Sequence, residues 1–263
     1  MPSLRDSGKL VGRSASVKQV ARQCNLSFPL SLRQFISTPG CPFSRCNRLH
    51  IKVLTMPVPP PKPTVPPQHA FATEAEKEDW LAAMLSRMCE IYSAAGIGVE
   101  VVSWENLTAA NLGSATFDNL NVLDVGECSG SASDEQNELF QNQNNVPDDQ
   151  RSNEIVVYFV QSVMKTDGGT LNGCANFPNG QPGAVIAQIA SQWTLAHEVG
   201  HVLGLNHISG EHRGCPASDL ECCSTPDRTR LMTGCSTSNI IGTPTIDQTE
   251  INTMTSSNLT RQC

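Results

Sequence analysis

The stretch HEVGHVLGLNH, His197–His207, holds three of the six histidines of this 263-residue chain. In an α-helix, His197 and His201 would lie on one face, a turn apart and roughly 40° from each other around the axis. Two imidazoles placed in this way can bind one metal ion from the same side. The stretch therefore predicts a helix that carries a metal site, and we expect the rest of the domain to be arranged around this helix.

The other residues of the stretch complete the predicted site. Gly204 suits the left-handed conformation that ends many helices, and the chain can then turn back and bring His207 to the metal. Three protein ligands leave a fourth position for water, which is typical of a catalytic zinc ion. Glu198 lies one step further round the helix than His197. We expect it to accept a proton from that water and not to bind the metal.

A family resemblance rests on this stretch and on a second one downstream. HEVGHVLGLNH resembles, at every fixed position, the consensus HExxHxxGxxH of the metzincin clan of zinc metallopeptidases. The clan also has a Met-turn beneath the zinc ligands, and the resemblance implies Met232 in RLMTGC for it, with Met254 as the rival. Gly234 stands where some members have a metal-binding Tyr, so three His and water are implied. The likeness covers roughly Leu49 to the C-terminus and leaves matrixin-like and pappalysin-like subfamilies open.

The resemblance implies a fold and an activity. The implied fold is α+β and metzincin-like: a twisted, mixed, mostly parallel sheet with backing helices, the active-site helix, and an irregular, disulfide-rich C-terminal subdomain. The implied activity is a monomeric zinc endopeptidase that cleaves extended protein substrates, with Glu198 as the general base. A non-catalytic secreted zinc-binding or adhesion module on the same scaffold is the alternative. An edge strand that pairs with substrate is implied at Ala184, Val185, Ile186, Ala187 and Gln188.

The cysteines indicate an exported protein. Eight of the eleven follow residue 47, an even set that could form four disulfides: Cys89, Cys128, Cys174, Cys215, Cys222, Cys223, Cys235 and Cys263. A structural zinc site is the alternative use of four of them, Cys215, Cys222, Cys223 and Cys235. A thiol–disulfide oxidoreductase is disfavoured, because the chain has no CxxC motif.

Charge and hydropathy exclude other classes. Residues 1–52 carry nine Lys or Arg and one acid, whereas residues 53–263 carry nine basic and 24 acidic side chains. The net negative charge of residues 53–263 argues against nucleic-acid binding. It would suit Ca2+ sites, although no EF-hand-like loop is present. No apolar run approaches the roughly 20 residues of a membrane span.

The N-terminal part is expected to be a separate extension. We predict an extension over residues 1–47 and a catalytic domain over residues 48–263. The extension is basic and contains Ser, which leaves a pro-segment, a targeting peptide and a mis-assigned start open. Cys41 or Cys46 could act as a latency cysteine on the zinc. Pro57–Pro67 reads as an extended connector.

The remaining pattern alternates strands and helices. A helix capped by Thr73 and Glu76 and ended by Gly96 should bury the apolar stripe Trp80, Met84, Leu85, Met88, Ile91 and Tyr92. Ser133 and Gln136 should cap a short polar helix, and the zinc helix should begin near Ser191. Strands are predicted at residues 49–53, 97–102, 121–125 and 155–160, and a last helix at residues 247–255.

Overall fold

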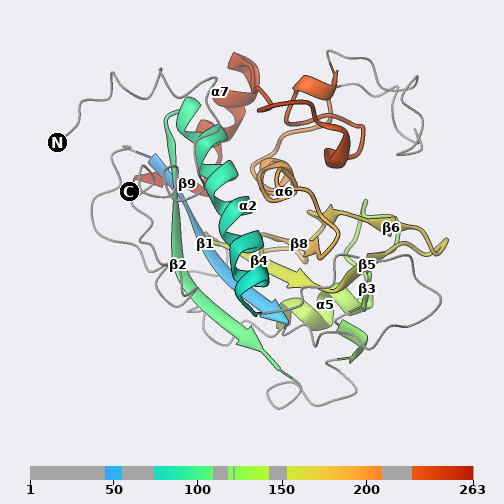
Figure 1. The fold of residues 1–263 in the computed structure, drawn as a ribbon. Coiled ribbons are helices and arrows are strands. Elements are labelled where there is room, and N and C mark those ends of the chain that lie inside the picture. The colour runs from blue at the N-terminus through green and yellow to red at the C-terminus, as the bar shows by residue number, and fades with distance from the viewer. Residues whose placement is uncertain are drawn as a thin grey trace.

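The apolar run IVVYFV forms the central strand, β4 (Ile155–Val160), and all six of its residues are buried. Continuous β-branched and aromatic side chains are typical of a strand covered on both faces, as predicted here. The structure, a computed structural model, describes residues 45–54, 74–108, 118–120, 122–141, 153–208 and 227–262. Within these ranges the chain folds as a mixed α and β structure, as the sequence predicts (Figure 1).

The main sheet has the order β2-β1-β4-β8-β7. Its other members are β1 (Arg45–Leu54), β2 (Ile97–Leu107), β7 (Gly173–Cys174) and β8 (Gly183–Ala187). The pairs β1–β2, β1–β4 and β4–β8 are parallel, whereas β7 runs antiparallel to β8. A short C-terminal strand, β9 (Thr260–Gln262), pairs antiparallel with the start of β1. The predicted mixed, mostly parallel sheet is therefore confirmed.

Two helices cover one face of this sheet (Figure 1). They are α2 (Glu74–Ala94) and α6 (Thr194–Val202), the helix that carries His197 and His201. The predicted stripe of α2 faces this core: Trp80 is partly buried there, and Met84, Leu85, Met88, Ile91 and Tyr92 are buried. The Tyr92 hydroxyl donates to the Ala196 carbonyl at 2.9 Å, which ties α2 to α6. Gly96 follows α2 with a φ of +72°, as expected of a helix stop.

The other face carries a smaller layer. It consists of α5 (Asp134–Gln141) and a second sheet of β3 (Val122–Asp124), β5 (Ser162–Met164) and β6 (Thr170–Leu171). The predicted cap of α5 is confirmed in both directions. The Ser133 N–H donates to the Gln136 side chain at 2.9 Å, and the Gln136 N–H donates to the Ser133 hydroxyl at 3.0 Å.

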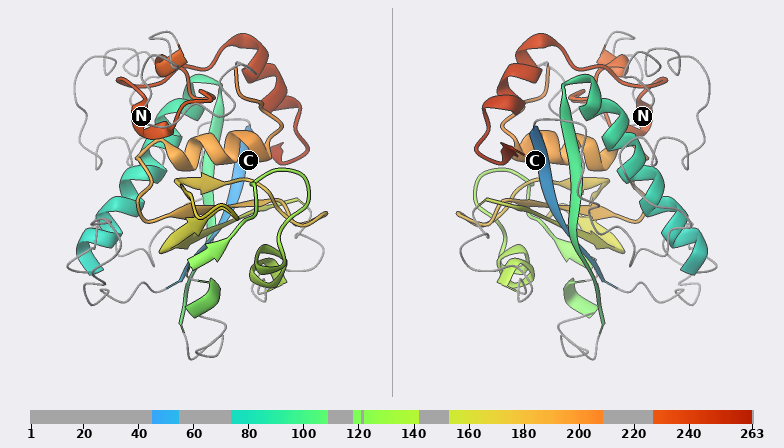
Figure 2. Two further views of the ribbon diagram at one scale, coloured as in Figure 1. Left: turned by 90° about the vertical axis from the view of Figure 1, so that its right-hand side faces the viewer. Right: turned by 90° about the vertical axis from the view of Figure 1, so that its left-hand side faces the viewer.

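Residues 227–256 of the C-terminal segment lie on the side of α6 away from the sheet, and the segment then returns to the sheet as β9 (Figure 2). It contains the short helices η3 (Asp227–Thr229) and η4 (Thr237–Asn239) and the helix α7 (Gln248–Ser256). The last helix was predicted at nearly these residues. The helix α6 therefore lies between the main sheet, which it covers, and residues 227–256.

The cysteines depart from the prediction of four disulfides. Cys128 pairs with Cys174, and Cys235 is also disulfide-bonded. Cys89, however, is buried on α2 and is not part of a disulfide, so the eight cysteines do not form four disulfides. A disulfide-bonded Cys235 also contradicts the alternative of a four-cysteine zinc site, because a zinc ligand must be a thiolate.

Three further predictions concern the N-terminal part of the chain, the start of the domain and membrane spans. Thr73 and Pro57–Pro67 lie outside the described residues. β1 begins at Arg45, three residues before the predicted start of the domain at Arg48. No helix among the described residues has the length and apolar character needed to cross a membrane.

Candidate metal centre

The helix α6 begins at Thr194, three residues after the predicted start at Ser191. It stops where predicted. Gly204 has a φ of +99°, and the Leu205 N–H donates to the Gly200 carbonyl at 3.0 Å. A residue with a Cβ would be strained at such a φ, so glycine suits the reversal that follows. The reversal returns the chain toward the helix and brings His207 to the side of His201.

The three histidines converge on one point. The Nε2 atom of His201 lies 3.1 Å from that of His197 and 3.1 Å from that of His207, and the third distance is 3.3 Å. Together they form a group that could hold a metal ion. Two nitrogen ligands of a tetrahedral zinc ion, at about 2.0–2.1 Å from the metal, lie roughly 3.3 Å apart. The observed triangle therefore fits zinc.

Hydrogen bonds to main-chain carbonyls orient two of the rings. The Nδ1 atom of His197 lies 2.7 Å from the Leu231 oxygen, and that of His201 lies 2.8 Å from the Leu205 oxygen. A carbonyl can only accept, so each Nδ1 carries the proton and each Nε2 keeps a free lone pair. Lone pairs this close repel one another unless a cation lies among them. A cation at the centre would remove this repulsion, so the donor set suits a metal ion.

Burial controls the charge of these side chains. Burial lowers the pKa of His197 to about 3, with a further contribution from the neighbouring His201. Burial also lowers the pKa of His201. Both imidazoles are therefore neutral near pH 7, which is the form that binds a metal ion. Burial raises the pKa of Glu198 to about 8, whereas a nearby metal cation would act in the opposite direction and favour the carboxylate.

Glu198 is buried against the strand β7. A Cβ added at Gly173 of β7 would lie 2.8 Å from the Glu198 Cγ and 3.0 Å from its Oε1. Real Cβ atoms essentially never approach that closely, so only glycine at this position leaves the carboxyl group where it is. Glu198 does not belong to the group of potential metal ligands, which consists of the three histidines.

Met232, the residue predicted for the Met-turn, packs against α6. Its side chain is fully buried, and a Cβ added at Gly200 of α6 would lie 2.8 Å from the Met232 sulfur. Its carbonyl accepts a hydrogen bond from the Ile208 N–H at 3.0 Å, next to His207. The rival, Met254, is buried in α7.

The predicted edge strand is displaced by one position in the sheet. Ala184–Gln188 coincides with β8, which lies inside the sheet between β4 and β7. Val185 and Ile186 pair with Cys174 and Gly173, and the Ala187 N–H donates to the Asn172 carbonyl at 2.9 Å. Because β7 occupies these positions, β8 cannot pair there with a substrate. Among the described strands, β7 is the outermost one beside α6.

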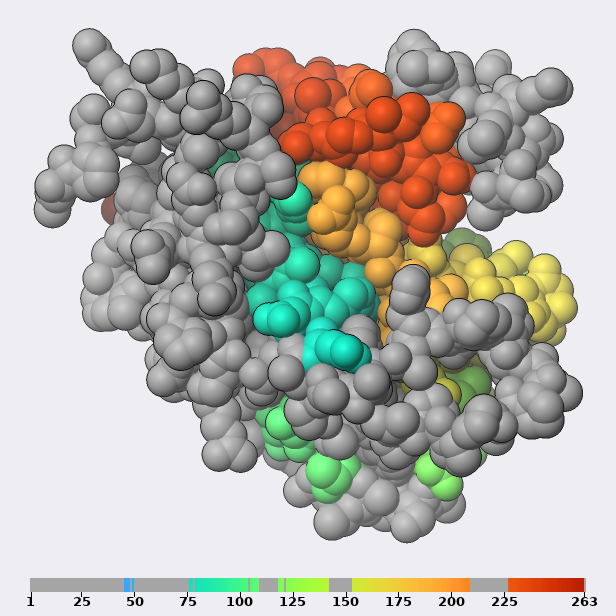
Figure 3. Space-filling model, in the orientation of Figure 1, coloured from blue at the N-terminus to red at the C-terminus, as the bar shows by residue number. Residues whose placement is uncertain are grey.

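Sequence reasoning missed the residues that support the site. The carbonyls of Leu205 and Leu231 carry no signal in the sequence, because every residue has a carbonyl. Gly200 does carry one, since glycine inside a helix is destabilising by about 1 kcal/mol relative to Ala and indicates close packing. On the surface, the orange segment that contains α6 reaches the solvent between α2 and the red C-terminal segment (Figure 3).

Comparisons with known proteins find a likeness to solved structures. No model of a known protein family matches the chain, and no curated protein matches it. Among solved structures the chain is similar to metalloproteinase II from Bacteroides fragilis, with a TM-score of 0.43 and 13% sequence identity. The match covers 90% of this chain and 60% of that one, so the chain spans less than two thirds of its length. So low a TM-score leaves function to be inferred from the histidine site itself.

Proposed function

We propose that this chain is a zinc-dependent endopeptidase of the metzincin type. The observation that carries the proposal is the convergence of the Nε2 atoms of His197, His201 and His207, separated by 3.1–3.3 Å. Two of the rings are oriented by carbonyls, so their lone pairs face the shared centre. A site with three histidine ligands has a fourth position left for water or substrate, which is the arrangement of catalytic zinc.

The residues around the centre have distinct tasks. Zinc bound there would acidify a water molecule and polarise a peptide carbonyl. Glu198 accepts a proton from that water at a carboxylate oxygen and passes it to the departing amine. The packing of Glu198 against Gly173 limits the movement of this carboxyl group. Met232 supports α6 from below through its contact with Gly200.

The strand β7 is the proposed place for substrate, instead of the strand β8 predicted from the sequence. β7 is the outermost described strand of the main sheet, and its Gly173 touches Glu198. An extended peptide that pairs with β7 as an added strand would therefore pass close to the general base. This arrangement supports cleavage within a chain, because a strand can extend past the site in both directions.

We also propose that the protein is exported. The Cys128–Cys174 disulfide and the disulfide-bonded Cys235 suit an oxidising compartment. The substrate would be a protein or peptide, and the enzyme would act as a monomer.

Cleavage of an unfolded protein by the purified full-length chain tests the function. We expect internal cleavage products by mass spectrometry, loss of activity with 1,10-phenanthroline, and recovery when zinc is added back. One zinc ion per chain without any cleavage would instead identify a non-catalytic zinc-binding module. Products shortened only from their ends would contradict the assignment as an endopeptidase.

A further inference from the structure

Two consecutive carbonyls of the C-terminal segment accept hydrogen bonds at the metal centre or next to it. The Leu231 carbonyl accepts from Nδ1 of His197 at 2.7 Å. The Met232 carbonyl accepts from the N–H of Ile208, the residue after His207, at 3.0 Å. The backbone at residues 231–232 therefore orients the ring of His197 directly. It also positions the main chain next to His207. Its position must be held firmly if the three Nε2 atoms are to stay together.

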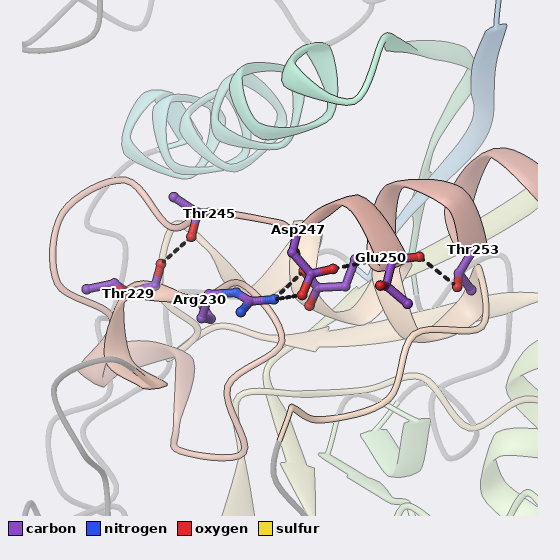
Figure 4. A network of polar contacts seen from close by, with 7 residues as sticks. Thr229, Arg230, Thr245, Asp247, Glu250 and Thr253 are labelled. Carbon is purple, nitrogen blue, oxygen red and sulfur yellow. Dashed lines mark hydrogen bonds and ion pairs between the residues drawn. The ribbon is translucent and has the colours of Figure 1, made fainter.

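The backbone just before these carbonyls is paired with a single residue downstream. The Leu231 N–H donates to the Thr245 carbonyl at 3.0 Å, and the Thr245 N–H donates to the Thr229 carbonyl at 2.8 Å. The Thr245 hydroxyl also donates to the Thr229 carbonyl at 3.2 Å (Figure 4). This pairing is an isolated β-bridge between Arg230 and Thr245, so by itself it restrains the segment only weakly.

The side chain of Arg230 adds a second support. Its Nη2 atom lies 2.7 Å from Oδ2 of Asp247 and 2.8 Å from Oε2 of Glu250, as Figure 4 shows. Both acids form the capping box of α7: the Glu250 N–H donates to Asp247 at 2.9 Å, and the Asp247 N–H donates to Glu250 at 2.6 Å. Arg230 thus ties the segment beneath the metal centre to the first turn of a helix.

Loss of the ion pairs of Arg230 would be strongly unfavourable, because one of the carboxylates is buried. The Glu250 side chain is only 10% exposed, so its carboxylate has little water to replace a lost cation. The Glu250 Oε1 and the Arg230 Nε are buried without a hydrogen-bond partner among the described residues. The two contacts of Nη2 and the hydrogen bond from the Asp247 N–H therefore offset the cost of burying the Glu250 carboxylate.

From these contacts we infer that Arg230, Asp247 and Glu250 form a positioning cluster for the metal centre. The cluster holds the Leu231 carbonyl against His197 and so keeps the Nε2 atom of His197 turned toward the other two ligands. The three residues touch neither the metal nor the substrate. They act through Leu231, and the inference rests on the proposed zinc site.

Zinc affinity of the full-length chain, measured by competition with a chromophoric chelator, tests the inference. Arg230→Met keeps the length of the side chain and removes its charge. We expect its zinc affinity to fall about 10-fold, the lower end of the usual effect of residues that orient metal ligands. The absorption spectrum of the Co2+-substituted protein should change as well, because it reports ligand geometry and not overall stability.

Two further variants serve as controls. Arg230→Lys should restore most of the affinity, because a single nitrogen makes both contacts in the native cluster. Lys165→Met removes a cation that also lies between two carboxylates, those of Glu127 and Asp167, at 3.2 and 3.3 Å. That cluster lies beside β5 and has no contact with residues 230–232, so zinc affinity and the Co2+ spectrum should not change.

Unchanged zinc affinity and an unchanged Co2+ spectrum in Arg230→Met would overturn the inference while leaving the proposed function intact. An equal loss in Lys165→Met would overturn it too, since any lost ion pair would then suffice. If Arg230→Met does not fold, Glu250→Gln provides the same test. Weaker zinc binding by this variant would support the inference, and unchanged zinc binding would overturn it. A native chain that binds no zinc would overturn the proposed function itself, and this inference with it.

Discussion

Glu198 is the residue that distinguishes a peptidase from a zinc-binding module. Glu198→Gln keeps the shape of the side chain but cannot accept a proton. Zinc content should stay near one per chain, and turnover should fall by about 10²–10⁴-fold, the usual contribution of a positioned general base. Metal analysis and peptide-cleavage kinetics on the same sample check this. Loss of zinc would make Glu198 a ligand, and unchanged turnover would disprove its catalytic role.

His207 is the ligand whose assignment depends on the turn at Gly204. His207→Ala removes one corner of a triangle whose sides are 3.1–3.3 Å. We expect zinc occupancy to fall sharply while the circular dichroism spectrum is preserved, because His207 is exposed and the core lies elsewhere. Tightly bound, stoichiometric zinc in this variant would contradict the assignment of the third ligand.

Gly173 controls the position of Glu198 by leaving room for it. In Gly173→Ala the new Cβ would lie 2.8 Å from the Glu198 Cγ and 3.0 Å from the Val185 carbonyl, so the carboxyl group or the strand must shift. We expect kcat to fall while zinc content is unchanged. Gly169→Ala is the matched control, because its Cβ would meet only the side chains of Asp167 and Lys165. Equal kcat values for both variants would show that Glu198 tolerates the shift.

At the scale of elements, α7 depends on an ionised cap. The backbone hydrogen bond from Glu250 and the ion pair with Arg230 hold the pKa of Asp247 below its usual value of 3.8. A carboxyl group whose pKa is lowered by folding stabilises the folded chain above its unfolded pKa. This contribution is lost as the pH falls through the folded pKa. The capping of α7 should therefore weaken only below about pH 3.8.

Asp247→Asn tests this dependence, because Asn can still cap the helix but carries no charge. We expect the variant to be less stable than the native chain at pH 7, and this difference to shrink as the pH falls below 3.8. Urea unfolding in the presence of a chelator measures this without a contribution from bound metal. A stability difference of the same size at every pH would mean that the charge of Asp247 is not its source.

At the scale of the whole molecule, the two ends of the described chain meet in the main sheet. β9 pairs with residues Arg45–Asn47 of β1. The Asn47 side chain is fully buried and donates to the Leu259 carbonyl at 3.1 Å and to the Thr260 hydroxyl at 3.0 Å. The structure thus includes in the folded part three residues that the sequence assigned to the extension.

Two shortened chains test this boundary. A chain that begins at Arg45 should fold and keep the thermal stability of the full-length protein. One that begins at Arg48 loses the β1–β9 pairing and the buried Asn47, and its melting temperature should be several degrees lower, as expected for the loss of about 1–3 kcal/mol. Equal melting temperatures would support the predicted start at Arg48.

The sequence by itself determined the parts whose geometry is local. The spacing of His197, His201 and Gly204 specifies a helix face and a helix stop, since both depend on residues within a few positions of one another. The run IVVYFV and the stripe of α2 were predictable for the same reason, because burial follows from the period of the apolar residues. These features were enough to predict the zinc helix and most of the main sheet.

Only the tertiary structure decided which residues distant in the sequence contact one another. A two-residue strand such as β7 has no periodic pattern, so the edge of the sheet was assigned to β8, the strand that the family resemblance implied. Disulfide formation depends on which thiols come together in space, and Cys89 of α2 lies in the hydrophobic core outside any disulfide. The carbonyl of Leu231 meets His197 across 34 residues, and Arg230 meets Glu250 across 20. Such contacts are set by the packing of the chain, because residue type and local spacing do not encode them.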